Sequence, residues 1–295
     1  MTFTLEAPAR PRHRRRVSQM IFRAATLFAL GLVLIPAIWI VLGIVLRAIP
    51  HFSFSVLTHT SAHGGLENAI VGSFIIMVGV AIIAGTIGLG AGIYLAEMSA
   101  TSQRGQRVDG LLRTATEVLA GVPSIVLGFV GYIALVVGLH WGYSLLPALI
   151  ILSMMVVPYI AKATENSLAQ VPTAYREGAE ALGMAPGYAL RHVILKTALP
   201  GITTGLLVAL AIAGGETAPL LYTAGWNDQM PTLALTGHQV PYLTYPVWAF
   251  YNQPSNSLRY LSYDAALILI VFIVTLLVVS RIIVARTQRH ADIRR

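Results

Sequence analysis

A carboxylate and a hydroxyl, Glu216 and Thr217, stand inside a long apolar stretch, after Gly214-Gly215 and before Pro219. An acidic side chain at membrane depth costs about 2.5–3.5 kcal/mol on insertion scales, so such a residue is a candidate for function. Glycine pairs and proline interrupt helical hydrogen bonding, and interrupted helices occur where the backbone is buried in protein or lines a cavity. We therefore expect Glu216, Thr217, Gly214 and Gly215 to line a substrate pathway. A second interpretation is that Glu216 is a polar tether between helices.

Other residues that could do chemistry occur in weaker arrangements. Glu97 and Glu117 lie near the ends of apolar stretches, where we expect them to face headgroups or loops. His59 and His63 are four residues apart in a loop without a third ligand nearby, so no metal site is predicted. The sequence has no cysteine, P-loop, HExxH or GxSxG motif. It therefore predicts neither catalysis nor a cofactor bound by this chain.

The composition predicts a membrane protein. Of 295 residues, 56% are hydrophobic and 11% are charged, and the mean hydropathy is +0.72. A bilayer core of about 30 Å needs about 20 apolar residues in a helix. Six such stretches predict an all-α polytopic fold with spans near 22–46, 68–97, 113–139, 144–165, 197–221 and 263–286.

The distribution of basic residues predicts the topology. With six spans, 18 of the 20 Lys and Arg residues fall on the side that holds both termini. The positive-inside rule then makes both termini cytoplasmic, in a multi-pass protein of the plasma (inner) membrane. The transmembrane domain (22–286) lies between a basic tail (1–21) and a short tail (287–295). The run "RPRHRRR" favours topology and contact with anionic membrane lipids over nucleic acid.

The cytoplasmic segment 171–196, which we call the elbow, has the pattern of two short helices separated by Gly183. Such a segment can lie on lipid headgroups. Its apolar side chains, among them those of Ala179 and Tyr188, are small or of moderate size, and the segment is not rich in Lys or Arg. This pattern favours insertion into a groove of a protein partner.

The longest segment on the other side of the membrane, about 222–262, is rich in aromatic residues, proline and amides. Aromatic residues with few charges are typical both of protein interfaces and of membrane-interface belts. We favour contact with an external protein through Tyr242, Tyr245 and Trp248, and the belt remains the alternative.

The elbow resembles the EAA signature of ABC importer permeases, with matching positions at Glu177, Gly178, Ala179, Gly183, Val193 and Leu195. Gly178 stands where alanine is usual, and Lys196 stands where proline is usual. Longer stretches are similar to phosphate-specific permeases of the PstA type: "GVPSIVLG" (121–128), "PYIAKATENSLAQVPTAYREGAEALG" (158–183) and "GGETAPLLYTAGW" (214–226). The resemblance covers roughly residues 65–285.

This resemblance implies a type I ABC importer permease fold that forms half of the pathway of an ATP-driven phosphate importer. The implied partners are a second homologous permease subunit, a cytoplasmic ABC ATPase dimer and an external phosphate-binding protein. ATP and Mg would be bound by the ATPase, which leaves this chain as a non-catalytic subunit. The residues assigned to ATPase coupling are Glu177, Gly178, Ala179, Gly183 and Tyr188.

Other functions stay open at this point. The substrate could be another oxyanion, such as sulfate or molybdate, because substrate choice rests mostly with the external binding protein. An ion-coupled secondary transporter is less favoured, since we find no internal repeat and only one convincing intramembrane carboxylate. A membrane-embedded enzyme lacks a nucleophile and base. Related phosphate permeases often carry an arginine one turn before the glutamate, but Ile212 stands there. We therefore expect an arginine of the partner permease to pair with Glu216.

Overall fold

The structure is a computed structural model that describes residues 12–97 and 103–292. The described residues form helices and connections and contain no strand. Parts of both predicted tails, residues 1–11 and 293–295, lie outside the described range. Where the tails are described they continue helices: α1 (Arg12–Ala48) includes the second half of the tail 1–21, and α12 (Asn256–Asp292) extends past residue 286.

The chain divides into two compact units, Met1–Pro50 and His51–Arg295. The first contains α1, whose apolar stretch Gln19–Ala48 is long enough to cross a bilayer. The second contains α2 (Ser55–Thr58), the 3₁₀ turn η1 (Ser61–His63), α3 (Glu67–Glu97), α4 (Gln103–Gly121), α5 (Ser124–Gly131), the π-helical turn η2 (Tyr132–Gly138), α6 (Leu145–Ala169), α7 (Thr173–Ala181), α8 (Pro186–Ala189), the π-helical turn η3 (Leu190–Ile194), α9 (Leu195–Gly215), α10 (Ala218–Thr223), α11 (Thr244–Ala249) and α12.

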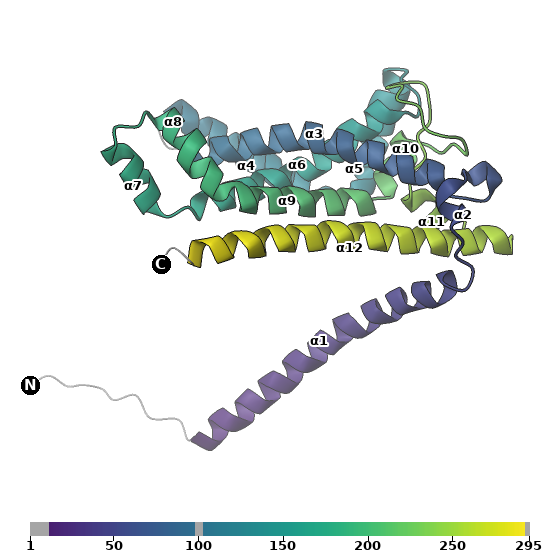
Figure 1. The fold of residues 1–295 in the computed structure, drawn as a ribbon, viewed down its shortest axis with the longest axis horizontal. Helices are drawn as coiled ribbons and strands as arrows, with labels where there is room; N and C mark the ends of the chain where they lie inside the picture. Colours follow the sequence, from purple (N-terminus) through teal and green to yellow (C-terminus); the bar gives the residue numbers. More distant parts are fainter. Residues whose placement is uncertain (1–11, 98–102, 293–295) are drawn as a thin grey trace, which may run out of the picture. The chain divides into compact units, whose positions relative to one another are not determined.

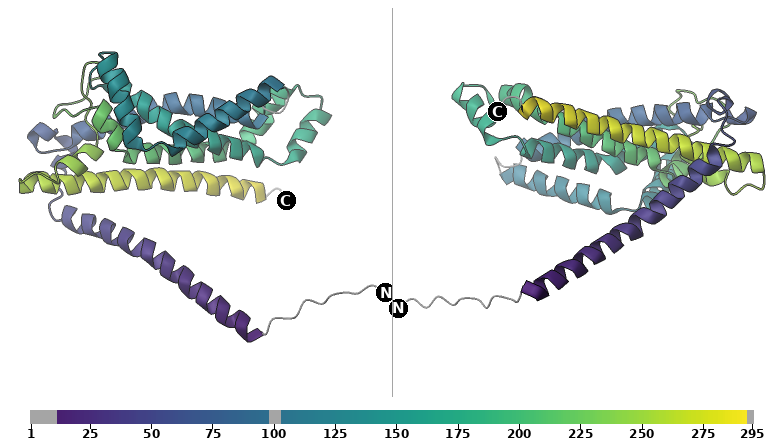
Figure 2. Two further views of the ribbon diagram at one scale, coloured as in Figure 1. Left: turned by 180° about the vertical axis from the view of Figure 1, so that it is seen from behind. Right: turned by 60° about the horizontal axis from the view of Figure 1, so that its bottom comes forward.

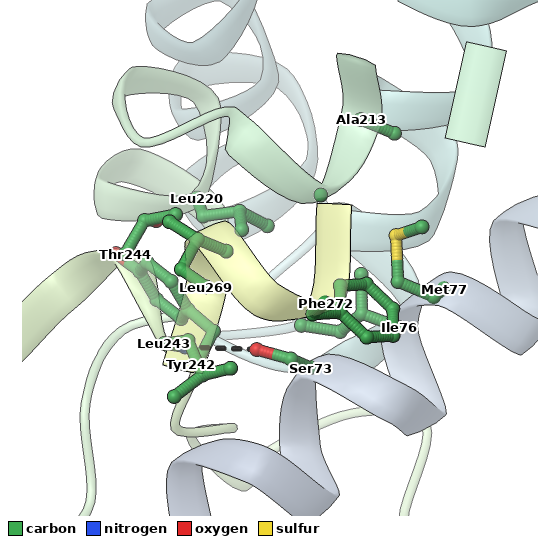
Figure 3. A pocket seen from close by; sticks show the side chains of 11 residues that line it. Ser73, Ile76, Met77, Ala213, Leu220, Tyr242, Leu243, Thr244, Leu269 and Phe272 are labelled. Atoms are coloured by element: carbon green, nitrogen blue, oxygen red, sulfur yellow. Dashed lines mark hydrogen bonds between the residues drawn. The ribbon is translucent and has the colours of Figure 1, made fainter. Parts of the chain in front are cut away.

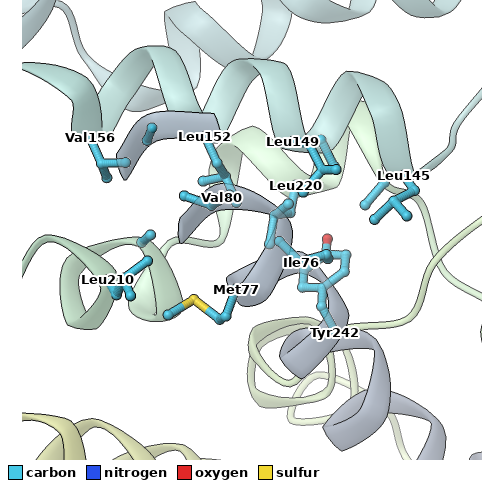
Figure 4. Close-up of a cluster of buried hydrophobic side chains, with 14 of the residues drawn as sticks. Ile76, Met77, Val80, Leu145, Leu149, Leu152, Val156, Leu210, Leu220 and Tyr242 are labelled. Atoms are coloured by element: carbon cyan, nitrogen blue, oxygen red, sulfur yellow. The ribbon is translucent and has the colours of Figure 1, made fainter. Parts of the chain in front are cut away.

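The second unit is built around α6, which packs against α3 and α9 (Figure 1). Most of the apolar part of α6 is buried, and its side chains meet those of α3 in the largest core cluster (Figure 4). Glycines on α3 make this approach possible. A Cβ on Gly88 would lie only 2.7 Å from the Cβ of Ile160. Small residues let membrane helices pack closely, which explains the glycine-rich sequence of α3.

The predicted span 113–139 is divided into two helices. α4 ends at Gly121, and α5 begins at Ser124 at an angle of 100° to it. Pro123, with φ −56° and ψ 134°, lies at the bend. Proline lacks an N–H donor and disfavours helical geometry in the residue before it. Five helices of the described chain are therefore long and apolar enough to cross a membrane, or six with the bent pair counted as one span.

The two ends of the second unit carry different short helices. Views from opposite sides place α7 and α8, which belong to the elbow, at one end of the bundle (Figures 1 and 2). The short helices α10 and α11 and the π-helical turn η2 lie near the other end. The features predicted to meet an ATPase and an external protein are thus separated by the length of the spanning helices.

Candidate functional site

The predicted fifth span, 197–221, is interrupted at Glu216 and Thr217, between α9 and α10. Glu216 is extended, with φ −74° and ψ 133°. Its N–H donates to the carbonyl of Ala213 at 3.2 Å, and its carbonyl accepts a hydrogen bond from Thr244 Oγ1 at 2.9 Å. The helix stops where Gly214-Gly215 and Pro219 predicted an interruption. The backbone of Glu216, rather than its carboxylate, ties this point to α11.

The carboxylate of Glu216 is partly exposed and has no cation to offset it nearby in sequence. Within residues 12–97 and 103–292 it forms no ion pair. The sequence has no Lys or Arg between residues 197 and 258. Two like charges about 4 Å apart repel by about 4 kcal/mol at an effective dielectric of 20. An anion could pass this carboxylate only if a proton or a cation from elsewhere neutralised it.

Gly214 and Gly215 face different surroundings. A Cβ on Gly214 would lie 3.5 Å from Met77 and Phe272, at the wall of a small pocket (Figure 3). A Cβ on Gly215 would lie 3.7 Å from Ile273, and Gly215 is exposed. The pocket volume open to water is about 10 Å³, which is about the space of one water molecule. It is therefore too small to hold an oxyanion, and Gly214 contributes to packing in this state.

The elbow is formed by α7, α8 and η3, with a left-handed residue at its bend. Gly183 has φ +68°, and a Cβ there would meet no atom within 4 Å. The glycine is therefore needed for its backbone conformation and not for close packing. This is the helix–glycine–helix arrangement that the sequence predicted.

An ion pair holds the elbow to the end of α3. Arg176 on α7 donates two hydrogen bonds to the carboxylate of Glu97, at 2.6 and 2.7 Å. The guanidinium also reaches the carbonyl of Leu168 at 3.4 Å. The carboxylate beside it raises the pKa of Arg176, which is charged in any case. Glu97, expected to face headgroups or a loop, contacts the elbow, and its side chain is mostly buried against α7.

The exposed face of the elbow differs from the predicted set. Glu177, Gly178, Gly183 and Tyr188 are exposed, but Ala179 is 4% exposed and packs inward. Ala179 therefore offers almost no surface to a partner. The largest apolar surface at the tip belongs to Leu182, which is 75% exposed, together with Tyr175 and Tyr188.

The opposite end carries an aromatic cluster. Tyr245 stacks on Trp226, with ring centroids 4.5 Å apart, and Phe250 packs edge-on against both rings. Trp248 is 57% exposed. Tyr242 is 1% exposed and belongs to the main core beside Ile76 (Figure 4). The prediction that Tyr242 contacts an external protein is thus corrected, because its ring fills the core.

A second group of charges joins α4 to α6 near the elbow end. Arg113 pairs with Glu165 at 2.8 Å and with Asp109 at 3.2 Å, and Lys162 pairs with Glu165 at 2.9 Å. These side chains and Glu117 line a cavity of about 80 Å³. Glu117, expected to face headgroups or a loop, thus borders a polar cavity between spans.

Comparison with known proteins identifies the family. The family described as binding-protein-dependent transport system inner membrane component matches residues 88–290. The chain belongs to this family. It is 53% identical over 283 residues to a Mycobacterium bovis protein named phosphate transport system permease protein PstA 2, covering 95% of this chain and 92% of that one. The phosphate transport system permease protein PstA of Yersinia pestis is 31% identical, with 94% and 92% covered.

Solved structures of other transporters show the same fold as this family member. A structure of the MetNI methionine ABC transporter in an inward-facing conformation superposes with a TM-score of 0.56 at 18% identity, covering 75% of this chain and 96% of that one. An amino acid ABC transporter crystallised with histidines gives a TM-score of 0.53 at 21% identity, with coverage of 76% and 94%. The chain is therefore an all-helical, multi-pass permease of the type I ABC importer fold.

One acidic residue of this permease was missed from the sequence. Asp264 on α12 is 3% exposed, and its Oδ1 has no hydrogen-bond partner among the described residues. It lies one residue after the predicted start of the last span at 263, and it is not among the residues predicted to have a function. The pattern "LSYDAAL" offered the only signal, since an acidic residue flanked by small and apolar residues is typical of a buried position.

Proposed function

We propose that this chain is one of two homologous permease subunits of an ATP-driven importer of inorganic phosphate. The observation that carries the proposal is the 53% identity over 95% of the chain to a protein named as a phosphate transport permease. In this proposal the chain forms half of the translocation pathway and performs no catalysis. ATP and Mg are bound by a cytoplasmic ATPase dimer, and phosphate is delivered by an external binding protein.

The elbow end is the cytoplasmic end in this proposal, and both termini are cytoplasmic. Leu182, Tyr175 and Tyr188 form the apolar tip that docks on the ATPase, while Glu177, Gly178 and Gly183 shape its polar side. The exposed area of these side chains supports a docking role, since apolar side chains at a protruding tip are typical of helices that insert into a partner's groove. The ion pair between Arg176 and Glu97 transmits movement of the elbow to α3.

The interruption at Glu216 and Thr217 lies on the anion pathway in this proposal. An arginine of the second permease subunit offsets the carboxylate, which otherwise repels phosphate. The Thr217 hydroxyl and backbone N–H groups near Gly215 donate to the passing anion. The absence of Lys and Arg from residues 197–258 supports a cation supplied by another chain.

Reconstitution tests this function. The chain is assembled in proteoliposomes with its homologous permease and ATPase, ATP is enclosed, and the phosphate-binding protein is added outside. We expect uptake of labelled phosphate that is lost when any one component is omitted. Matched vesicles given labelled sulfate and a sulfate-binding protein should show none. Uptake of sulfate or molybdate would instead support the oxyanion alternative, and uptake driven by an ion gradient without ATPase would contradict the proposal.

A further inference from the structure

The two interrupted helices meet at one place, which we call the seam and define as α5, η2, the connection 139–144 and α10. A Cβ on Gly128 of α5 would lie 2.8 Å from Pro219 Cα and 3.1 Å from the carbonyl oxygen of Ala218. The backbone N–H of Ser144 donates to the carbonyl of Thr223 at 2.9 Å. The seam therefore joins the helix that follows the bend at Pro123 to the helix that follows Glu216.

The seam contains no Lys or Arg. The sequence has no Lys or Arg between residues 114 and 161 or between 197 and 258. Hydrogen-bond donors of the seam are therefore hydroxyl, indole and backbone N–H groups and the imidazole of His140. An anion that passes here has to be recognised through such groups, and a partner chain has to supply any cation.

Three tyrosines from three different elements converge at the seam. The ring centroid of Tyr132 on η2 lies 5.8 Å from that of Tyr143 and 6.4 Å from that of Tyr222 on α10. Each of the three is partly exposed. Phe129 packs edge-on against Tyr222 at 5.9 Å, and a Cβ on Gly225 would lie 3.0 Å from the Cβ of Tyr143. The rings are thus held by packing while part of each remains accessible.

The phenol hydroxyls differ from the hydroxyls of Thr223 and Ser144 in having no backbone acceptor. Thr223 Oγ1 donates to the carbonyl of Pro219 at 2.7 Å, and Ser144 Oγ donates to that of Gly142 at 3.1 Å. Within the described part of the chain, none of the three tyrosine hydroxyls donates to a backbone carbonyl or a carboxylate, and the side chains of Tyr132 and Tyr143 share a hydrogen bond. Burial, and less strongly the neighbouring Tyr132, raises the pKa of Tyr143, so this phenol keeps its proton. Partly buried tyrosine hydroxyls usually find a partner.

We propose that Tyr132, Tyr143 and Tyr222 form an uncharged hydrogen-bond-donor site for the phosphate group on the translocation pathway. The inference rests on the proposed function and adds the residues that this chain contributes to recognition of the anion. A phosphate group could come from the transported ion or from a lipid headgroup, and the transported ion is the one we propose. The site binds oxygen acceptors weakly, as a pathway requires, because it contributes hydrogen bonds without a charge.

Tyr-to-Phe variants test the site, because they keep the packed rings and remove only the hydroxyls. Tyr222→Phe, the pair Tyr132→Phe and Tyr143→Phe, and the triple variant are assembled into the complete transporter. Tyr251→Phe is the matched control, since Tyr251 is half exposed and its ring packs on Tyr263, away from the seam. The measurements are phosphate uptake per assembled complex at saturating binding protein, ATP hydrolysis, and thermal unfolding.

We expect Tyr222→Phe to lower the uptake rate roughly 10-fold, which is the effect of losing one hydrogen bond to a charged group. The triple variant should lose more, and Tyr251→Phe should match the wild type. Unfolding temperatures of the single variants should stay at the wild-type value. Wild-type uptake by the triple variant would overturn the inference. So would variants that lose thermal stability in bilayers rich in anionic lipid but keep wild-type uptake, because that result indicates headgroup contact.

Failure of the proposed phosphate function can be distinguished from failure of the tyrosine site. If the wild-type complex imported sulfate and not phosphate, the phosphate assignment would fall, while the same variants could be compared for sulfate uptake. A loss of uptake in the variants would then support hydroxyl recognition of a tetrahedral oxyanion, and no loss would overturn it.

Discussion

Gly183 allows the elbow to turn because its φ of +68° lies in the left-handed region. A Cβ at this position would meet no neighbouring atom, so any effect of substitution comes from the backbone alone. Gly178, on the regular helix α7, has equally empty surroundings. Replacing either glycine by alanine therefore adds the same methyl group to the elbow. At Gly183 the alanine would have to adopt a left-handed conformation, whereas at Gly178 it would sit in a regular helix.

We predict that Gly183→Ala destabilises the elbow by about 1 kcal/mol, since left-handed geometry costs a residue with a Cβ about 1–2 kcal/mol. Gly178→Ala should stabilise α7 by up to about 1 kcal/mol. The measurement is phosphate transported per ATP hydrolysed, with thermal unfolding of the assembled complex as the check on folding. Gly183→Ala should lower this ratio and Gly178→Ala should not. Equal ratios in both variants would contradict the role assigned to Gly183.

At the residue scale, local signals predicted local conformation. The sequence Gly214-Gly215 before Pro219 was enough to place the interruption at Glu216, and Gly183 was enough to place the turn. Burial was harder to predict, because it depends on residues distant in sequence. Tyr242 fills the core against α3, and Ala179 packs inward, although both belong to segments whose composition suggested exposed surfaces.

At the scale of elements, the ion pair between Arg176 and Glu97 connects α7 to the end of α3. Two short hydrogen bonds and a basic side chain that is 33% exposed distinguish it from the pair Lys162–Glu165, which has one hydrogen bond and a lysine side chain that is 63% exposed. Exposed ion pairs contribute about 0–1 kcal/mol, so a pair with two hydrogen bonds and a less exposed basic side chain should lie at or above the upper end of that range.

We predict a coupling free energy of about 1 kcal/mol or more between Arg176 and Glu97 in a double-mutant cycle of alanine variants. The matched cycle for Lys162 and Glu165 should give about 0.5 kcal/mol or less. Arg176→Ala should also reduce phosphate transported per ATP hydrolysed, and the exchanged pair Arg176→Glu with Glu97→Arg should recover part of the loss. No coupling between Arg176 and Glu97, with transport unaffected, would show that the contact is incidental.

Hydropathy predicted where the long helices lie but not how they bend. The apolar stretch 113–139 reads as one span because every part of it is apolar enough, and Pro123 signals only that regular helix stops. The angle of 100° between α4 and α5 depends on the packing of α5 against α10, for which Gly128 has to be a glycine. That contact joins residues about 90 positions apart and leaves no periodic pattern in the sequence.

At the scale of the whole molecule, the exposed aromatic surface opposite the elbow is where we expect the binding protein to dock. Trp248 is 57% exposed, whereas Tyr242 is buried. Exposed tryptophans at interfaces often contribute 2 kcal/mol or more to binding.

We predict that Trp248→Ala raises the concentration of binding protein that half-stimulates ATP hydrolysis by roughly 10-fold or more. Tyr242→Ala is the contrasting variant. It should instead lower the free energy of unfolding by about 3–5 kcal/mol, as large aromatic truncations in cores do. An unchanged half-stimulating concentration for Trp248→Ala would place this surface in the membrane-interface belt.

The proposed anion pathway brings these parts together, since it runs from the aromatic end past Glu216 to the elbow end. The seam, which has no Lys or Arg, and the carboxylate of Glu216 need a cation from the second permease subunit. If the carboxylate of Glu216 neutralises that cation, removing the carboxylate leaves the positive charge of the partner subunit free to hold phosphate too tightly.

The decisive measurement is the initial rate of phosphate uptake by assembled Glu216→Gln transporter over a range of phosphate concentrations and pH values. We predict that the complex assembles, that half-saturation occurs at a lower phosphate concentration, and that the maximal rate falls because release is slowed. Glu67→Gln, at the start of α3, is the matched control and should transport as the wild type does. Wild-type uptake by Glu216→Gln at every concentration and pH would contradict the pathway role and support Glu216 as a structural tether.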